Sequence, residues 1–310
     1  MRFFKRPNID FMNSRKLAFI ISGSLMLLSV ISLVLHGGPR LGIDFRGGTL
    51  IEVRFEDKAN PTAPIEVPIN KVREAMGRYG LASSEIKHYG SLQEISIQTE
   101  VKKGIDLQIV ESLQKEFPQY KVIERRKETV GPKIGKELVG SAIKAIFFSL
   151  LLILLYIMFR FEFRFGVGAV VALFHDVLIT LGVFSVLNLE VDIPVIAALL
   201  TIVGYSLNDT IVVYDRIREN MKKKVTDYAG VINDSINQTL SRTIITSGTT
   251  LIVVVILFFF GGEIIKDFAL ALMCGVIVGT YSSIYIASPI LVEWEARRKP
   301  AKVKVAAKKR

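Results

Sequence analysis

Six long apolar stretches constrain this chain more than any other feature of its sequence. A bilayer core of about 30 Å requires roughly 20 helical residues to cross it, and a helix satisfies its backbone polar groups internally. We therefore predict six transmembrane helices, at residues 17–35, 138–159, 166–187, 193–214, 243–262 and 268–292. The expected fold is a polytopic α-helical membrane protein.

The distribution of Lys and Arg predicts how these helices are oriented. Nearly all the membrane-adjacent positive charge lies in segments 1–16, 160–164, 215–242 and 293–310, whereas the hairpins at 188–192 and 263–267 are acidic. Positive segments remain in the cytoplasm. We expect a cytoplasmic N-terminus, a cytoplasmic loop at 215–242 and a basic cytoplasmic tail at 293–310. Residues 17–35 exceed a signal-peptide core and no small-x-small cleavage site follows, which indicates a retained signal anchor.

The charge balance fits a membrane protein better than a nucleic-acid-binding one. The formal net charge is +11, yet half of the residues are hydrophobic and the basic residues cluster beside the apolar stretches. This pattern favours contact with membrane lipids over a nucleic-acid partner. Cys274 is the only cysteine, so no intrachain disulfide is possible.

Residues 36–137, between the first two spans, are predicted to form an extracytoplasmic domain. Alternating strands and amphipathic helices are expected in the order β-α-β-β-α-β, at residues 51–55, 69–79, 84–89, 94–100, 107–117 and 120–130. This order is typical of a ferredoxin-like α+β sandwich. The helices are expected to bury Val72, Met76, Leu107, Val110 and Leu113.

The sequence offers little support for an enzyme. No Ser-His-Asp set, metal-ligand spacing or phosphate-binding loop is present in the extracytoplasmic part, and His36, His88 and His175 are scattered. We expect no catalytic residues, no metal and no cofactor. Ionisable residues inside apolar helices stand out instead, because each is costly in a bilayer and usually functional.

Asp209 is the strongest of these intramembrane candidates. It lies about five residues, or about 8 Å, inside the expected cytoplasmic end of its helix. Tyr205 lies one turn away, and Arg242 opens the next helix, followed on one face by Thr246 and Thr249. A desolvated carboxylate that is intermittently paired with Arg can take up and release a proton. A static Asp209–Arg242 pair that fastens two helices is the alternative.

Asp176 is the second candidate, about 15 Å into its helix and near the bilayer midplane. It could support the same relay or serve structure alone. His175 precedes it, and adjacent helix positions point about 100° apart, so the two are not expected to share a face. A hydrogen-bonded packing role is favoured for His175. Gly275 and Gly279 form a small-xxx-small pair, which is mostly a helix-packing signal.

Several blocks of this sequence together resemble one known family. Residues 41–49 (LGIDFRGGT) follow the first span, and the spans and their ends contain 174–176 (FHD), 204–220 (GYSLNDTIVVYDRIREN), 237–250 (NQTLSRTIITSGTT) and 279–283 (GTYSS). These blocks resemble the SecD/SecF family of the resistance-nodulation-division superfamily, in particular its smaller, SecF-type members.

The resemblance implies a role in protein export driven by the proton-motive force, in the bacterial cytoplasmic (inner) membrane. The implied partners are SecD as a separate polypeptide, the SecYEG channel, the SecA motor, the translocating preprotein and protons. The family's intramembrane aspartate and arginine map to Asp209 and Arg242. An exporter of small hydrophobic solutes and a non-transporting scaffold are the alternatives, and the modest domain size disfavours the first.

Further residues complete the expected site. Relay support is expected from Asp176, Tyr205, Asn208, Thr246 and Thr249. The glycine-rich turn could couple the spans to the extracytoplasmic domain, because glycine absorbs backbone change, or it could simply seat the domain rigidly. That turn comprises Asp44, Arg46, Gly47 and Gly48.

Overall fold

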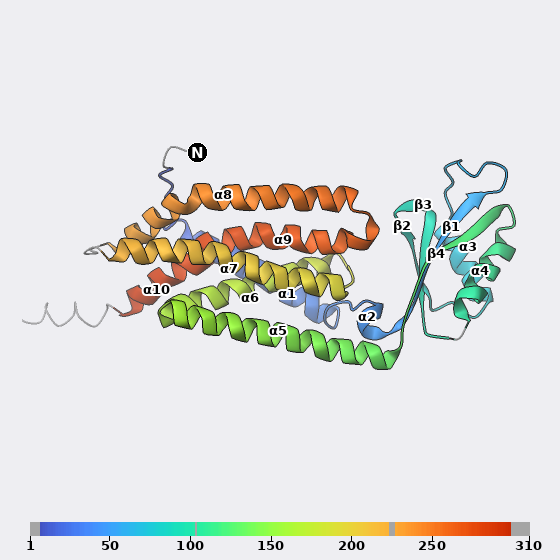
Figure 1. Cartoon of the computed structure of the whole chain (residues 1–310), viewed down its shortest axis with the longest axis horizontal. Coiled ribbons are helices and arrows are strands. Elements are labelled where there is room, and N and C mark those ends of the chain that lie inside the picture. Colours follow the sequence, from blue (N-terminus) through green and yellow to red (C-terminus); the bar gives the residue numbers. More distant parts are fainter. Residues whose placement is uncertain (1–6, 103, 223–226, 299–310) are drawn as a thin grey trace, which may run out of the picture. The chain divides into compact units, whose positions relative to one another are not determined.

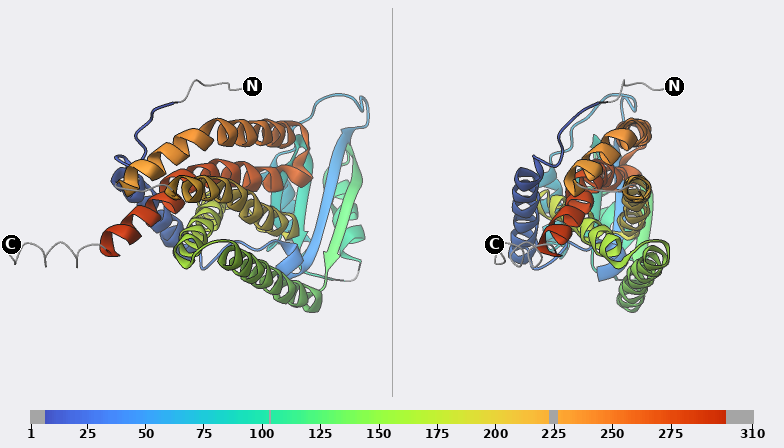
Figure 2. Two further views of the ribbon diagram at one scale, coloured as in Figure 1. Left: turned by 60° about the vertical axis from the view of Figure 1, so that its left-hand side comes forward. Right: turned by 90° about the vertical axis from the view of Figure 1, so that its left-hand side faces the viewer.

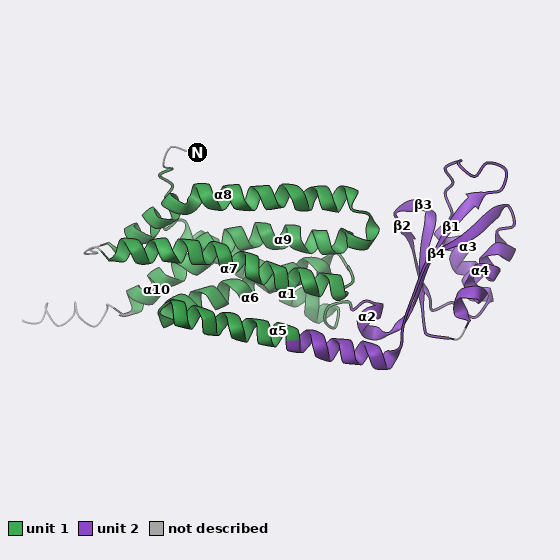
Figure 3. Cartoon of the chain, viewed as in Figure 1, with its two compact units in different colours: residues 1–40, 145–310 green, residues 41–144 purple. Residues whose placement is uncertain are grey.

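The computed structural model describes residues 7–102, 104–222 and 227–298 and divides the chain into two compact units (Figures 1 and 3). One unit is a helical bundle from Met1–Arg40 and Ala145–Arg310, and the other is an α+β domain from Leu41–Lys144. Each is described by itself below.

The six predicted spans are confirmed as helices long and apolar enough to cross a membrane. The first five are single helices, and the sixth is built from α9 and α10 joined by a short π-helical segment. Their bounds are α1 Arg15–Leu35, α5 Pro132–Arg160, α6 Phe163–Val186, α7 Ile193–Met221, α8 Tyr228–Phe260, α9 Lys266–Ser282, the π segment Ser283–Ala287 and α10 Ser288–Arg298. A 3₁₀ turn, Glu263–Ile265, precedes α9.

The structure differs from the expected loop at 215–242, because most of that segment is helical. The α7 helix continues to Met221, and α8 already begins at Tyr228. The side chain of Asp227 starts α8 by accepting a hydrogen bond from the backbone N–H of Gly230 at 3.0 Å. Ile232, Ile236 and Leu240 then recur every fourth residue and are all buried. This amphipathic pattern explains why the helix extends beyond the apolar stretch.

The helices α6, α7 and α9 form the centre of the bundle. They pack on one another, α1 packs on α6, and α8 packs on α7 and α9 (Figure 2). At least half of the most apolar part of α6 and α7 is buried, whereas 6% of that of α5 is. The α5 helix therefore presents most of its apolar side chains to its surroundings, as expected of a lipid-facing span.

Two glycines allow α9 to approach α7 closely, as the small-xxx-small pattern predicts. A Cβ atom on Gly275 would lie 2.2 Å from Cγ1 of Ile202, and one on Gly279 would lie 3.0 Å from Cβ of Ser206. The second contact brings α9 against Ser206, which belongs to the polar site described below.

We expect Gly275→Ala to destabilise the bundle by about 1–3 kcal/mol, since the added methyl overlaps a fully buried neighbour. The measurement is the midpoint of thermal unfolding of the purified chain in detergent. Gly204→Ala on α7 is the matched control, because a Cβ there meets no atom within 4 Å. Equal midpoints for the two variants would contradict the close approach.

The α+β unit contains a four-stranded antiparallel sheet with the order β2-β3-β1-β4. Two helices, α3 and α4, lie on the same face of the sheet (Figure 1). The predicted ferredoxin-like arrangement is thereby confirmed. The bounds are α2 Ile43–Arg46, β1 Gly48–Asp57, α3 Ile69–Arg78, β2 Glu85–Tyr89, β3 Ser91–Thr99, α4 Ile105–Glu116 and β4 Tyr120–Val130.

The core of this domain confirms most of the predicted apolar pattern and corrects one helix face. Val72, Met76 and Leu113 are fully buried, and Val110 is partly buried. Leu107 was predicted to be buried but is 64% exposed. The buried face of α4 instead begins at Ile105, the first residue of the helix. It continues one turn later at Ile109 and two turns later at Ser112 and Leu113.

Candidate functional site

Asp209 lies on the buried face of α7 and is 3% exposed. Its Oδ2 accepts a hydrogen bond of 3.2 Å from the hydroxyl of Ser247 on α8. That hydroxyl in turn accepts a hydrogen bond of 2.7 Å from Thr280 on α9. A carboxylate and two hydroxyls from three different helices thus form a continuous polar chain within the bundle.

Arg242, the expected partner of Asp209, is exposed at the surface of α8. Among the residues with described side chains, it makes no ion pair with Asp209 or with any other carboxylate. Asp209 and Arg242 therefore lie on two helices that pack on each other, α7 and α8, and the structure does not join them in an ion pair.

The predicted supporting residues around Asp209 separate into a buried and an exposed group. The Tyr205 hydroxyl is buried and has no hydrogen-bond partner within the described part of the chain, so it does not bond Asp209. Asn208 and Thr249 are exposed. The hydroxyls of Thr246 and Thr249 donate to carbonyls of their own helix, including that of Arg242 at 3.0 Å. Asn208 and Thr249, together with Arg242, therefore lie on the exposed surface of α7 and α8.

Asp176 on α6 is completely buried and has hydrogen-bond partners on three helices. Its Oδ2 accepts hydrogen bonds from Ser206 on α7 at 2.5 Å and from Ser282 on α9 at 2.7 Å. Its Oδ1 lies 2.8 Å from Nδ1 of His175. The side chain thereby connects the three central helices, and no Arg or Lys within the described residues neutralises it.

His175 contacts its neighbour directly, contrary to the expectation that the two residues point apart. The ring is 1% exposed and stacks on Tyr281 with ring centroids 6.2 Å apart. Its Nε2 has no hydrogen-bond partner among the residues that the structure describes. Adjacent side chains leave the helix in different directions, but the Asp176 carboxylate and the imidazole are long enough to meet. The two groups therefore form a buried, hydrogen-bonded pair.

The π-helical segment Ser283–Ala287 begins immediately after Ser282. The Ser288 hydroxyl donates to the Ser283 carbonyl at 2.8 Å, and the Tyr214 hydroxyl donates to the Ala287 carbonyl at 3.0 Å. These side-chain bonds hold the wider turn at both of its ends. Short π segments inside α-helices occur frequently at functional sites.

The predicted coupling turn belongs to the α+β unit. Asp44 and Arg46 lie in the short helix α2, and Gly47 follows with a φ of 78°, a value that favours glycine. A Cβ atom on Gly47 would lie 3.0 Å from Cα of Pro132, the first residue of α5. Gly48 then opens β1. The turn is thus packed directly against the start of a transmembrane helix.

Four hydroxyl residues of the site were not predicted from sequence: Ser206, Ser247, Thr280 and Ser282. The sequence contains a signal for one of them. Ser282 lies seven residues after Gly275 and three after Gly279, so it continues their small-residue face. Single hydroxyls in apolar helices are common because they can bond their own backbone. Only the packed helices show that three of these hydroxyls reach carboxylates.

The site is suited to holding and moving protons. It contains two buried carboxylates, a histidine and several hydroxyls, and the described residues include no group of three or more His, Cys, Asp or Glu side chains that could hold a metal ion. Carboxyl and imidazole groups exchange protons readily, whereas hydroxyls can donate and accept hydrogen bonds during transfer.

The chain matches the family described as protein export membrane protein SecD/SecF, C-terminal, over residues 109–297, and the SecD/SecF GG motif over residues 33–59. It is 48% identical to protein translocase subunit SecF of Rhodothermus marinus, covering 96% of each chain. It is 46% identical to the SecF subunit of Vibrio alginolyticus, covering 92% of this chain and 89% of that relative.

Solved structures show the same relationship. The crystal structure of SecDF from Thermus thermophilus, described as a translocon-associated membrane protein, matches 94% of this chain with a TM-score of 0.83 and 40% identity. A SecDF structure in a super-membrane-facing form matches 97% with a TM-score of 0.70 and 39% identity. The chain spans 39% and 41% of those two longer proteins. By sequence over nearly its whole length and by fold, the chain belongs to the SecF branch of the SecD/SecF protein-export family.

Proposed function

We propose that this chain uses the proton-motive force to promote protein export, as the SecF-type half of a complex with a separate SecD chain. Protons would pass Asp209 and Arg242, and their passage would move the transmembrane helices and the extracytoplasmic domain. A domain that binds an emerging preprotein and changes position with each proton cycle would prevent the preprotein from sliding back. The chain would act as a transport subunit with no reaction of its own.

The observation that carries this proposal is the state of Asp209. It is buried in a membrane-spanning helix, and its one described hydrogen bond comes from the neutral hydroxyl of Ser247. Arg242 on the neighbouring α8 is exposed and forms no ion pair with any side chain that the structure describes. A permanent ion pair would hold the carboxylate charged. A carboxylate whose partner is neutral, with the cation of the neighbouring helix not bound to it, can alternate between the protonated and the charged state.

The available driving force is sufficient for such a switch. One charge that crosses the membrane gains about 2.3 kcal/mol per 100 mV. This energy corresponds to a bias of roughly fiftyfold in a two-state equilibrium. We place the moving elements at the Asp176 cluster with its neighbouring π segment and at the turn from Asp44 to Gly48, which packs on α5.

The outer surface of α7 and α8 supports the proposal of a SecD partner. Asn208, Arg242 and Thr249 are exposed there, on helices that would otherwise face hydrocarbon. An exposed arginine within a bilayer is costly. Coverage by a second chain with its own intramembrane carboxylate would remove that cost and complete the proton path. Association of the resulting complex with SecYEG and SecA belongs to the same proposal.

We further propose the bacterial cytoplasmic membrane as the location, with both termini in the cytoplasm. In a Cys274→Ala background, a cysteine at Lys102 should react with an external membrane-impermeant thiol reagent. Cysteines at Asn13 or Lys222 should be protected until the cells are permeabilised. Asn13 and Lys222 both lie in positively charged segments, and such segments remain in the cytoplasm. External labelling at either of these two sites would show that the predicted orientation in the membrane is wrong.

The function is tested with inverted membrane vesicles that contain or lack this chain. With the chain present, an imposed proton gradient should increase ATP-driven preprotein entry, and an ionophore should remove the increase. An equal gradient-dependent increase without the chain would contradict the proposal. An increase in preprotein entry that persists with the ionophore would indicate a scaffold. Gradient-driven movement of a small hydrophobic solute, with no effect on preprotein entry, would indicate a solute exporter.

A further inference from the structure

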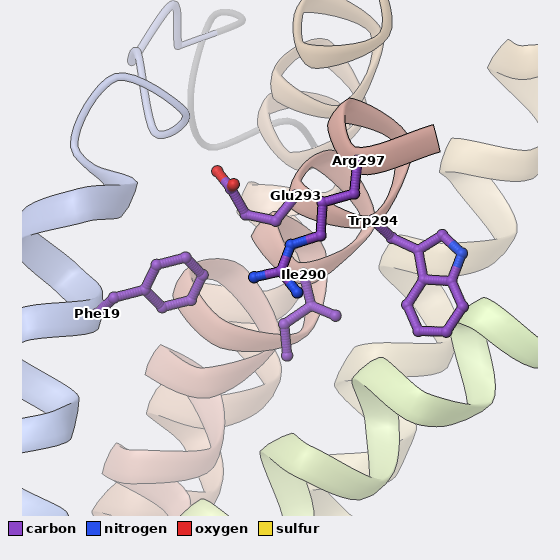
Figure 4. Close-up of a pocket in the computed structure, with 5 residues that line it drawn as sticks. All are labelled: Phe19, Ile290, Glu293, Trp294 and Arg297. Carbon is purple, nitrogen blue, oxygen red and sulfur yellow. The ribbon is translucent and has the colours of Figure 1, made fainter. Parts of the chain in front are cut away.

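A cavity of about 600 Å³ lies where α1 begins and α10 ends, and the proton path does not use it. Its described lining residues are Phe19 from α1 and Ile290, Glu293, Trp294 and Arg297 from α10. Figure 4 shows Phe19 on one side, Trp294 on the other, and Ile290 and the Arg297 guanidinium between them.

The cavity is apolar at its inner part and charged at its outer part. Phe19 lies one turn inside the start of α1, and Ile290 lies two turns before the end of α10. Trp294 is 38% exposed and is held by an edge-to-face contact with Phe163, with ring centroids 6.2 Å apart. Tryptophan in this position is typical of the boundary between hydrocarbon and headgroups.

The charge left over in the cavity is positive. Glu293 is paired with Arg15, whose Nε lies 3.0 Å from its carboxylate. Arg297 is exposed and forms no ion pair with any side chain that the structure describes. The set of Arg15, Glu293 and Arg297 therefore has a net charge of +1, carried by a guanidinium with several free N–H donors. Such a fork matches the geometry of a phosphate group.

We propose that this cavity is a binding site for one anionic phospholipid. The phosphate would bind Arg297, and the upper part of an acyl chain would lie against Phe19, Ile290 and Trp294. The inference is independent of the proposed function, because it rests on the cavity and its charge alone.

The dimensions favour a lipid over a helix of a partner protein. The volume lies within the range of roughly 300–1,000 Å³ that is typical of small-molecule sites. A helix with its side chains is about 10–12 Å across, so several turns of one would exceed this space. The cavity also contains the elements that a lipid needs, since its apolar wall lies beside Arg297, which has no ion pair among the described side chains.

Trp294 provides the measurement, because it is the only tryptophan in the chain. The full chain is reconstituted into bilayers of equal amounts of phosphatidylglycerol and phosphatidylcholine, with brominated acyl chains on one lipid or the other. Bromine quenches tryptophan fluorescence at close range. We expect stronger quenching when phosphatidylglycerol carries the bromine, which corresponds to a preference of about fivefold, the contribution of one cationic residue near a membrane surface.

The variants separate a bound lipid from bulk lipid. Arg297→Gln should reduce the preference to near one, and Arg297→Lys should retain part of it because the charge remains. Arg216→Gln is the matched control, since Arg216 is a partly exposed arginine of α7 that pairs with Glu219 at 2.9 Å and does not line the cavity. It should leave the preference unchanged.

Three outcomes would overturn the proposal. Equal quenching by the two brominated lipids in the wild-type chain would show that no anionic lipid is selected. An unchanged preference in Arg297→Gln would show that Arg297 does not select it. Absence of quenching by either lipid would show that protein covers the cavity.

Discussion

Replacement of Asp209 by asparagine should abolish the part of preprotein entry that depends on the proton gradient. The amide keeps the volume of the carboxyl group and can still accept the hydrogen bond from Ser247. It cannot take up a proton. The bundle should therefore assemble normally, and entry driven by ATP alone should continue at the wild-type rate, while the gradient-dependent increment falls to the background of vesicles without the chain.

The control for this variant is Asp234→Asn. Asp234 is an exposed carboxylate on α8 outside the buried site, so its loss removes the same charge without touching the proposed path. Its gradient-dependent increment should equal that of the wild type. If correctly assembled Asp209→Asn complexes retain the full increment, Asp209 has a structural role and the scaffold interpretation gains support.

Replacement of Asp176 by alanine should cause the largest loss of stability. The change removes the hydrogen-bond partner of the Ser206 hydroxyl and of His175 Nδ1 in a fully buried position, and Ser282 keeps only its bond to Gly279 at 3.1 Å. Each buried group without a partner costs about 1–3 kcal/mol, so the two groups together predict a loss of about 2–6 kcal/mol. Unfolding in detergent, followed by circular dichroism, measures it.

Asp176→Asn separates the structural role from a proton-holding role. The amide oxygen can accept from both serines, and the amide nitrogen can donate to His175, so the unfolding midpoint should stay close to that of the wild type. The gradient-dependent increment should nevertheless fall if Asp176 supports the relay. The exposed control Asp234→Ala should change stability by less than about 0.5 kcal/mol. A midpoint for Asp176→Ala equal to that of this control would contradict the three-helix connection.

The sequence predicted the architecture well, because long apolar stretches and alternating strands each allow few folds. Six spans are confirmed, and Ile95 and Ile97 are both buried opposite Val53 and Ile51 in the sheet. The error at Leu107 arose from a choice between two apolar faces of one short helix. Both faces carry aliphatic residues, and the contact with the sheet selects the face of Ile105 and Ile109.

The sequence predicted the site less completely, because side-chain partners depend on how helices pack. The depth of Asp209 and Asp176 could be read from the apolar pattern, and both are buried. The partners of these two carboxylates could not be predicted from the sequence. Ser247 donates a hydrogen bond to Asp209, where Arg242 was expected, and Ser206 donates one to Asp176 from another helix. Such contacts join residues 30 or more positions apart, which no local spacing reveals.

The most direct test is to observe the proton on Asp209. Infrared difference spectroscopy of the complex with its SecD partner detects the C=O stretch of a protonated carboxylic acid as pH is changed. We expect a carboxyl band that appears on protonation in the wild type, persists in Asp234→Asn and disappears in Asp209→Asn. Identical difference spectra for the wild type and Asp209→Asn would show that Asp209 does not exchange a proton, and would contradict the proposed mechanism.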